Sequence, residues 1–127
     1  MKDQVQIGVT VAVGGGLGTL ARAAIAQAAV NNGVLTLWAV LFVNVTGALV
    51  LGWYAAHVRN SNRWSTLMVG FVAAGILGSF TTFSAFSFEV VELFETGDFL
   101  IGSVYAVATI GVGLVAATIG RRFAEQR

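Results

Sequence analysis

Four long apolar stretches dominate the sequence and restrict the fold it can adopt. They cover about residues 5–30, 34–57, 64–94 and 99–121. A helix needs roughly 20 mostly apolar residues to cross the hydrocarbon core of a bilayer, so each stretch is long enough to span a membrane. We therefore expect an all-α membrane protein with four transmembrane helices, in which residues 1–127 form a single transmembrane domain.

The composition supports a membrane protein and excludes several functions. Only 10% of the residues are charged and 57% are hydrophobic, whereas a soluble domain has about 25% charged residues. The absence of cysteine excludes disulfides, thiolate metal sites and a cysteine nucleophile. A formal net charge of +1 provides no basic surface for nucleic acid. The single histidine and the lack of paired acids leave no group for acid–base or nucleophilic catalysis, so we expect no enzyme.

The third stretch is too long to form one straight transmembrane helix. About 31 residues would make a helix of roughly 46 Å, which exceeds the membrane even with tilt. Its middle contains Gly75, Gly78 and a cluster of Ser and Thr, which favour helix poorly. We predict a break between Gly78 and Thr82. Because non-helical backbone persists at membrane depth only where protein or water covers it, the break predicts a functional site.

Two polar residues lie inside the first two stretches, and each has two interpretations. Arg22 either extends toward the membrane surface or places its charge in a water-filled vestibule. Asn44 either joins two helices by hydrogen bonds or donates to a passing anion, since its amide has two N–H donors.

Hydroxyl and phenyl side chains alternate after the predicted break. The hydroxyls either bond to their own helix or line a polar path. The rings either pack or turn their electropositive edges toward an anion. Glu89 follows on the same helix and is deep enough to need a hydrogen-bond partner. The hydroxyl residues are Thr81, Thr82, Ser84 and Ser87, and the rings are Phe80, Phe83, Phe86 and Phe88.

Several glycines predict close contact between helices. Gly14 and Gly18 have the four-residue spacing that allows two membrane helices to approach each other. Gly111, Gly113 and Gly120 are expected to thin the fourth helix in the same way.

The polar residues, taken in order, resemble the CrcB/Fluc family of fluoride channels. Residues 78–87 (GSFTTFSAFS) are similar to the family pattern G-G-x-T-T-F-S-T-F-S. Residues 17–22 are similar to L-G-A-x-x-R, and Val43-Asn44 to the end of G-T-L-x-V-N. Tyr105 matches a tyrosine of the family's last helix. The resemblance covers nearly the whole chain.

The resemblance implies an antiparallel two-fold dimer with two narrow fluoride pathways along the subunit interface. Phe83 and Phe86 would present ring edges to the ion, and Asn44 would donate to it. A structural Na⁺, not transported, would be held by backbone carbonyls of Gly78 and Thr81 and shared by both subunits. Arg22 would be the first-helix arginine, and its exact role is left open. We assign Arg22 and Glu89 as structural or vestibule residues. The other implied pathway residues are Thr82, Ser84, Tyr105 and Thr109.

Three of the departures from the family pattern remove an expected hydroxyl. Val40 and Ala85 stand where the family has threonine, and Gly113 stands where a pathway hydroxyl is expected. The polar lining is therefore thinner than in the family, and impairment of one of the two pathways would be consistent with this.

The basic residues are placed asymmetrically along the chain. With four spans, both termini and the link near Asn60 share one side of the membrane, and that side holds every Lys and Arg outside the spans. The positive-inside rule then puts both termini in the cytoplasm, for a multi-pass protein of a prokaryotic cell membrane. An antiparallel homodimer requires one sequence to insert both ways, so this bias favours a related partner subunit over a second copy. The basic residues are Lys2, Arg59, Arg63, Arg121, Arg122 and Arg127.

The sequence thus predicts a channel for passive fluoride export, which would lower cytoplasmic fluoride toxicity. One alternative is a small proton-coupled cation or multidrug exporter, which needs a carboxylate in mid-span. Glu89 is the only candidate, and it lies off centre. The other alternative is a non-conducting membrane assembly subunit, which would leave the hydroxyl-rich break unexplained.

Overall fold

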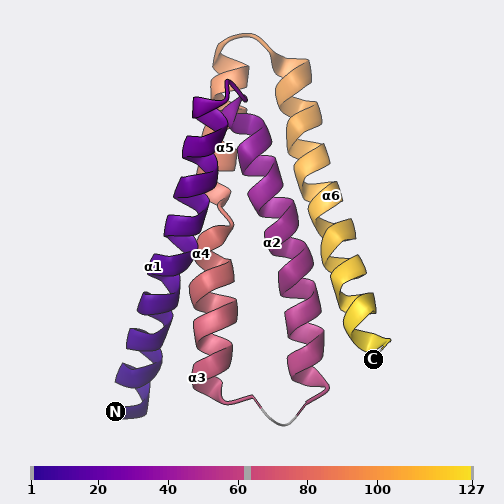
Figure 1. The fold of residues 1–127 in the computed structure, drawn as a ribbon. Coiled ribbons are helices and arrows are strands. Elements are labelled where there is room, and N and C mark those ends of the chain that lie inside the picture. The colour runs from indigo at the N-terminus through magenta and orange to yellow at the C-terminus, as the bar shows by residue number, and fades with distance from the viewer. Residues whose placement is uncertain (1, 62–63, 127) are drawn as a thin grey trace.

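The computed structural model describes residues 2–61 and 64–126, which form helices joined by short links. Four helical segments run alternately up and down and are long and apolar enough to cross a membrane. Figure 1 shows both termini at the same end as the link between the second and third segments. The predicted all-α fold with four spanning helices is confirmed. The segments are α1 (Lys2–Asn31), α2 (Thr36–Arg59), a composite third helix (Thr66–Glu95) and α6 (Phe99–Glu125).

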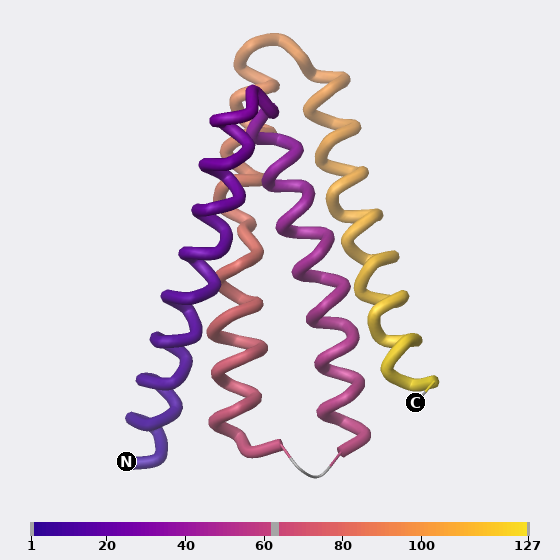
Figure 2. The backbone as a smooth tube through the Cα atoms, in the orientation of Figure 1, coloured from indigo at the N-terminus to yellow at the C-terminus, as the bar shows by residue number. Residues whose placement is uncertain are grey.

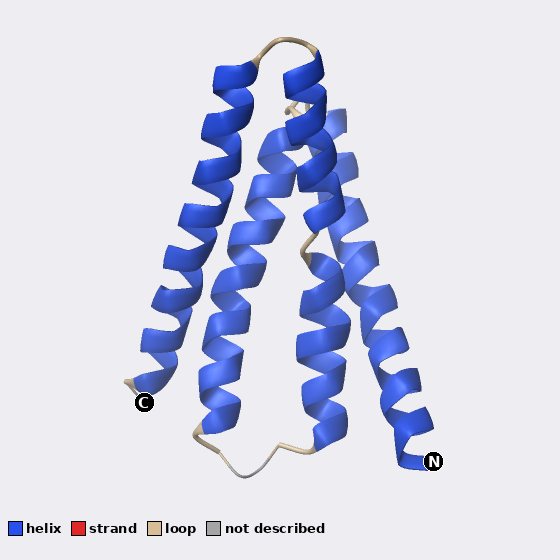
Figure 3. Ribbon diagram, turned by 180° about the vertical axis from the view of Figure 1, so that it is seen from behind, coloured by secondary structure: helices blue, strands red, loops and turns tan. Residues whose placement is uncertain are grey.

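The third segment is broken near its middle, as predicted. Its first half begins with α3 (Thr66–Val69), continues through the π-helix η1 (Gly70–Leu77) and ends with α4 (Gly78–Phe80). After an extended pair of residues, α5 (Phe83–Glu95) forms the second half. The tube in Figure 2 and the view from behind in Figure 3 show the chain leaving the helical path there and resuming it. The π-helix was not predicted.

The links at the end opposite the termini are short turns that depend on glycine. Gly33 has a φ of 68° and Gly97 a φ of 89°. Only glycine adopts this left-handed backbone without steric cost, and such a residue commonly ends a helix. At the other end, Ser65 begins the third segment, because its side-chain oxygen accepts a hydrogen bond from the Met68 amide at 3.2 Å.

Helix α1 packs against η1 through bare backbone. A Cβ atom added to Gly14 would overlap the carbonyl oxygen of Phe71, and one added to Gly18 would overlap that of Ile76. The close approach predicted from the Gly14 and Gly18 spacing is therefore confirmed. The contact holds the first half of the broken helix against α1.

Helix α2 packs against α6 in a similar way. A Cβ atom on Gly52 would overlap the carbonyl oxygen of Ala117, and one on Gly120 would overlap that of Leu49. The prediction for Gly120 is confirmed. It is wrong for Gly111 and Gly113, where an added Cβ would meet nothing within 4 Å in the described part of the chain. Those two glycines therefore make no close approach to another described helix.

The apolar exterior and the end charges suit a membrane environment. Large side chains such as Leu100 and Val107 are more than two-thirds exposed, at 77% and 73%. Lys2, Arg59 and the Arg121–Arg122 pair belong to the end of the molecule that holds the termini. Arg63 and Arg127, also expected on that side, lie outside the described residues.

Candidate functional site at the break in the third helix

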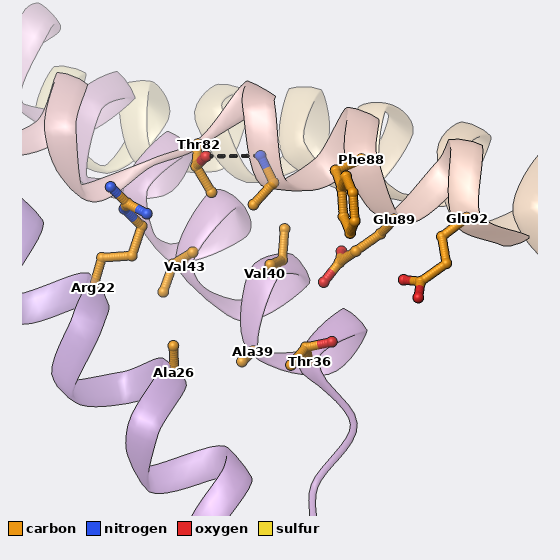
Figure 4. A pocket seen from close by; sticks show the side chains of 11 residues that line it. Arg22, Ala26, Thr36, Ala39, Val40, Val43, Thr82, Phe88, Glu89 and Glu92 are labelled. Atoms are coloured by element: carbon orange, nitrogen blue, oxygen red, sulfur yellow. Dashed lines mark hydrogen bonds between the residues drawn. The ribbon is translucent and has the colours of Figure 1, made fainter.

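The break consists of Thr81 and Thr82 in extended conformation. Thr81 has ψ 158°, and Thr82 has φ −145° and ψ 123°. The Thr81 hydroxyl donates to the Leu77 carbonyl at 3.1 Å, which ends the first half-helix. The Thr82 hydroxyl accepts from the Ala85 amide at 3.2 Å and caps α5 (Figure 4, dashed line). The threonine cluster therefore replaces backbone bonds that the interruption removes.

Asn44 of α2 fastens the break from the side. Its amide nitrogen donates to the Thr82 carbonyl at 2.9 Å, and its amide oxygen accepts from the Thr82 amide at 2.7 Å. One side chain thus satisfies both backbone groups of Thr82, which extended backbone at membrane depth requires. The interhelical link considered for Asn44 is present, and one N–H of its amide is not used by this pair.

Gly47 is a site residue that the sequence reasoning missed. A Cβ atom there would overlap the Cγ2 atom of Thr81. Gly47 lies three positions after Asn44, and residues at this spacing share a helix face. This spacing could have identified Gly47 from the sequence. The face of α2 that bonds to the break through Asn44 also needs a residue without a side chain one turn later, where Thr81 packs.

Arg22 of α1 binds the end of the first half-helix. Its Nε atom donates to the Ser79 carbonyl at 3.2 Å, and the residue is half-buried. Figure 4 shows its guanidinium directed toward the break near Thr82. The side chain therefore turns into the protein rather than toward the end of α1.

Two backbone carbonyls at the break lose their usual helical partners. The amides that would pair with the Gly78 and Thr81 carbonyls, four residues on, belong to Thr82 and Ala85. These amides donate to the side chains of Asn44 and Thr82 instead. The two carbonyls predicted to hold a cation are therefore released by the hydrogen bonds that form the break.

A cavity of about 290 Å³ opens beside the break, between α1, α2 and α5. Arg22 and Thr82 lie at one end of it, and Glu89 and Glu92 at the other (Figure 4). Its wall is otherwise largely apolar and includes Val40 and Ala85, two positions where the family pattern has threonine.

A row of aromatic rings connects α5 to α6. The ring centroids of Phe83 and Phe86 are 5.7 Å apart, and those of Phe86 and Tyr105 are 5.6 Å apart. The Tyr105 hydroxyl donates to Glu89 Oε2 at 2.6 Å, which provides the partner expected for this buried carboxyl. Phe86 is buried, whereas Phe83 is 77% exposed. The structure thus brings together four of the predicted site residues.

The remaining predicted hydroxyls lie on both sides of this row. The Ser84 and Thr82 hydroxyl oxygens are 3.2 Å apart. Thr109 is buried one turn after Tyr105, and its hydroxyl has no hydrogen-bond partner among the described residues. A buried hydroxyl without a partner is uncommon and suggests that water or an ion supplies one.

The described residues contain no cluster of three or more His, Cys, Asp or Glu side chains that could hold a metal. The oxygen atoms that lie at the break are backbone carbonyls and hydroxyl groups. These are the ligands that hard cations prefer.

Comparison with known proteins gives a consistent result. Residues 9–121 match the family model described as "CrcB-like protein, Camphor Resistance (CrcB)". A Rhizobium leguminosarum protein named "Fluoride-specific ion channel FluC" is 38% identical over 87% of this chain and 89% of its own length. Proteins of the same name from Francisella philomiragia and Hyphomonas neptunium are 32% identical (91% and 92% covered) and 36% identical (87% and 88% covered).

The family model and these relatives span the four helices, the break and the side chains that fasten it. The agreement covers nearly the whole chain rather than one motif. The chain therefore belongs to the CrcB family of membrane proteins.

Proposed function

We propose that the chain is a subunit of a channel through which fluoride leaves the cell passively, lowering fluoride toxicity in the cytoplasm. The observation that carries the proposal is the break in the third helix, where Asn44 holds extended backbone at membrane depth beside the Phe83–Phe86 pair. The printed names of the relatives support fluoride as the ion.

Uncharged donors near the break suit a strongly hydrated anion. Fluoride enters a narrow pathway only if the protein replaces the water that it loses, and leaves only if no site binds it too tightly. Asn44 retains one amide N–H after binding Thr82, and the buried Thr109 hydroxyl has no partner in the described part of the chain. Ser84 adds an exposed hydroxyl beside Thr82. These groups offer hydrogen bonds without a fixed positive charge.

The two phenylalanines add a weaker attraction. The edge of an aromatic ring is electropositive, so a ring that presents its edge attracts an anion. Phe86 lies between Phe83 and Tyr105, and this row leads from an exposed ring to a buried hydroxyl. We assign the ring edges of Phe83 and Phe86, followed by Tyr105, to the narrow part of the pathway.

An antiparallel two-fold dimer would complete the pathway. Phe83 is 77% exposed although it belongs to the same aromatic row as buried Phe86. A second subunit covering this ring would enclose the row between two proteins. Two such rows, one in each subunit, would form two pathways along the interface.

The released carbonyls of Gly78 and Thr81 would hold a structural Na⁺ at the centre of the dimer. Unwound backbone carbonyls are known ligands for Na⁺ in membrane proteins. The arrangement fits, because the Thr82 and Ala85 amides that would occupy these carbonyls are bonded elsewhere. The same pair from a second subunit would complete the oxygen ligands. The ion would link the subunits and would not be transported.

The charge distribution supports both termini in the cytoplasm. Arg59, Arg121 and Arg122 lie at the end that holds the termini, while the opposite link from α5 to α6 contains Asp98 and no basic residue. Basic residues near helix ends are retained on the cytoplasmic side. Because this bias disfavours insertion in both directions, a related subunit of opposite bias is our preferred partner, with a second copy as the alternative.

The membrane potential would drive export without another energy source. A potential that is negative inside favours the exit of an anion by about 2.3 kcal/mol per charge per 100 mV. A proton-coupled cation exporter competes with this proposal because Glu89 is buried in α5. Its carboxyl accepts a hydrogen bond from Tyr105 within α5, off the centre of the third helix, which suits a structural pair better than a mid-span carrier site.

The test is fluoride efflux from proteoliposomes that contain the purified chain, alone and together with a related subunit. A fluoride electrode records efflux after a potassium ionophore fixes the membrane potential. We expect rapid fluoride efflux without a proton gradient, and no comparable efflux of chloride. Efflux that requires a proton gradient would support the exporter, and the absence of fluoride efflux in both preparations would contradict the proposal.

A further inference from the structure

We propose that Arg59 and Arg121 form an anion-capture site at the terminal end of the molecule, which loads fluoride into the pathway. This inference rests on the proposed function and adds a binding site that lies away from the break. It follows from a groove between α2 and α6, from the row of residues that leads into that groove, and from an ion-pair cluster at its mouth.

The groove has a volume of about 450 Å³ and an apolar floor. It exists because α2 and α6 meet backbone to backbone where Gly52 faces the carbonyl of Ala117. Ala55 and Ala56 continue the floor with side chains too short to fill the space, and Arg59 and Arg121 line the same groove. The result is a low-dielectric trough with two guanidinium groups.

A continuous row on α6 leads from the candidate site to this groove. Tyr105, Thr109, Gly113, Ala117 and Arg121 follow one another at intervals of four residues. Residues four apart lie next to each other on a helix, and at 3.6 residues per turn the row advances by about 40° at each step. It begins at the Tyr105 hydroxyl, which donates to Glu89, and passes the Thr109 hydroxyl, which has no partner among the described residues. It ends at Arg121, about 160° around the helix from Tyr105.

Helix α2 presents a matching face. Asn44, Ala55 and Arg59 are 11 and then 4 residues apart, close to whole numbers of helical turns, so they lie on the same side of α2. Asn44 holds the break, and Ala55 and Arg59 line the groove. One face of α2 therefore carries both Asn44 and Arg59, whereas the row on α6 winds around its helix between Tyr105 and Arg121.

One carboxylate oxygen already shows how these arginines bind an anion. Glu125 Oε1 is 3.1 Å from an Nη atom of Arg59 and 3.7 Å from Nε of Arg121. Two guanidinium groups therefore share a single carboxylate, which leaves the cluster with a net charge of +1. Each guanidinium has five N–H donors, more than this shared oxygen can accept. A small anion would bind at the position of the Glu125 carboxylate, in competition with it.

We expect the two arginines to speed the entry of fluoride into the pathway and not to change the selectivity among anions. A groove with low-dielectric walls and charge of one sign concentrates counter-ions and speeds their entry. The arginine side chains are more than half exposed, at 65% and 55%, so salt screens them over about 10 Å at 0.1 M. The site should therefore matter most at low fluoride concentration and low ionic strength.

The test compares R59Q/R121Q, E125Q and the control R122Q in the fluoride efflux assay. Arg122 is the matched control because it is the next basic residue on α6, is exposed and does not line the groove. We expect R59Q/R121Q to slow initial efflux at least about threefold at low ionic strength, with the difference fading in high salt. R122Q should remain close to the unmodified chain, and E125Q should be faster.

Two results would overturn the inference. One is that R122Q slows efflux as much as R59Q/R121Q does, because the effect would then follow from net charge alone. The other is unchanged efflux in the double variant at low ionic strength. If R59Q/R121Q does not assemble, R59K/R121K, which keeps the charges, takes its place as a check on assembly. Efflux from E125Q that is no faster than from the unmodified chain would then overturn the inference. Failure of the unmodified chain to conduct would contradict the proposed channel instead, so the two failures are distinguishable.

Discussion

At the scale of single residues, Asn44 holds the two halves of the third helix at the break. Its amide replaces the two backbone hydrogen bonds that Thr82 would make inside a helix. The sequence indicated that Asn44 is polar and deep in a span, but not that it pairs with Thr82. The two residues are 38 positions apart, and only the packing of α2 against the broken helix brings them together.

Replacing Asn44 with alanine should destabilise the protein by about 2 kcal/mol, because two hydrogen bonds to partly buried backbone are lost. Thr46→Ala is the matched control, since the Thr46 hydroxyl donates to the Phe42 carbonyl of its own helix at 2.6 Å. Thermal unfolding in detergent should show a clear fall in Tm for Asn44→Ala and little change for Thr46→Ala. Equal Tm values would contradict the fastening role of Asn44.

Replacing Phe83 and Phe86 with isoleucine should abolish fluoride efflux while the protein still assembles. Isoleucine keeps the side chain apolar and bulky but removes the electropositive ring edge. Phe88→Ile is a suitable control, because Phe88 is also exposed on α5 but is not part of the Phe83–Phe86–Tyr105 row. Fluoride efflux and size-exclusion profiles should be recorded for each variant. Normal efflux from Phe83→Ile/Phe86→Ile would remove the role of the ring edges.

At the scale of helices, much of the architecture follows from the sequence. Lipid cannot satisfy backbone polar groups, so long apolar stretches have to be helical, and a stretch that is too long and rich in Gly, Ser and Thr has to be interrupted. The π-helix at Gly70–Leu77 was not predictable in this way. It arises from a shift of backbone hydrogen bonds, which has no residue signature of its own.

The glycine contacts also show what the local sequence cannot predict. The Gly14 and Gly18 spacing correctly predicted close packing, whereas glycine content alone wrongly predicted it for Gly111 and Gly113. Which glycines face a neighbouring helix depends on the rotation of each helix about its axis. That rotation is fixed by contacts with other helices rather than by the local sequence.

Gly18→Ala should destabilise the fold by about 1–3 kcal/mol, because the added methyl group would overlap the Ile76 carbonyl. Gly16→Ala is a close control on the same helix, since its Cβ would meet nothing within 4 Å among the described residues. That substitution should be neutral or stabilise α1 by up to about 1 kcal/mol. A Tm measurement that ranks Gly16→Ala below Gly18→Ala would contradict this packing.

At the scale of the whole molecule, the candidate pathway is incomplete in one chain. Phe83 is largely exposed, and the Gly78 and Thr81 carbonyls have lost their helical partners. The sequence of one subunit contains these groups but not the partner that would cover them. The dimer and the shared ion therefore stay predictions. They are supported by the exposed Phe83 ring and by the carbonyls that lack helical partners.

Exchanging Na⁺ for a bulky organic cation should weaken the dimer, because the released carbonyls of the two subunits would lose the ion that they share. Size-exclusion chromatography and thermal unfolding should both report the loss, and restoring Na⁺ should reverse it. Potassium serves as a second comparison, since it has the same charge as Na⁺ and a larger radius. Identical dimer content and Tm in all three cations would argue against an ion at Gly78 and Thr81.

The central claim is that this broken-helix protein conducts fluoride passively and selectively. The most direct test is the reversal potential of current through bilayers that contain the chain with its partner subunit, under opposed fluoride and chloride gradients. The account predicts a reversal potential that follows the fluoride gradient and does not respond to pH differences across the membrane. A reversal potential set by chloride or by protons would contradict it.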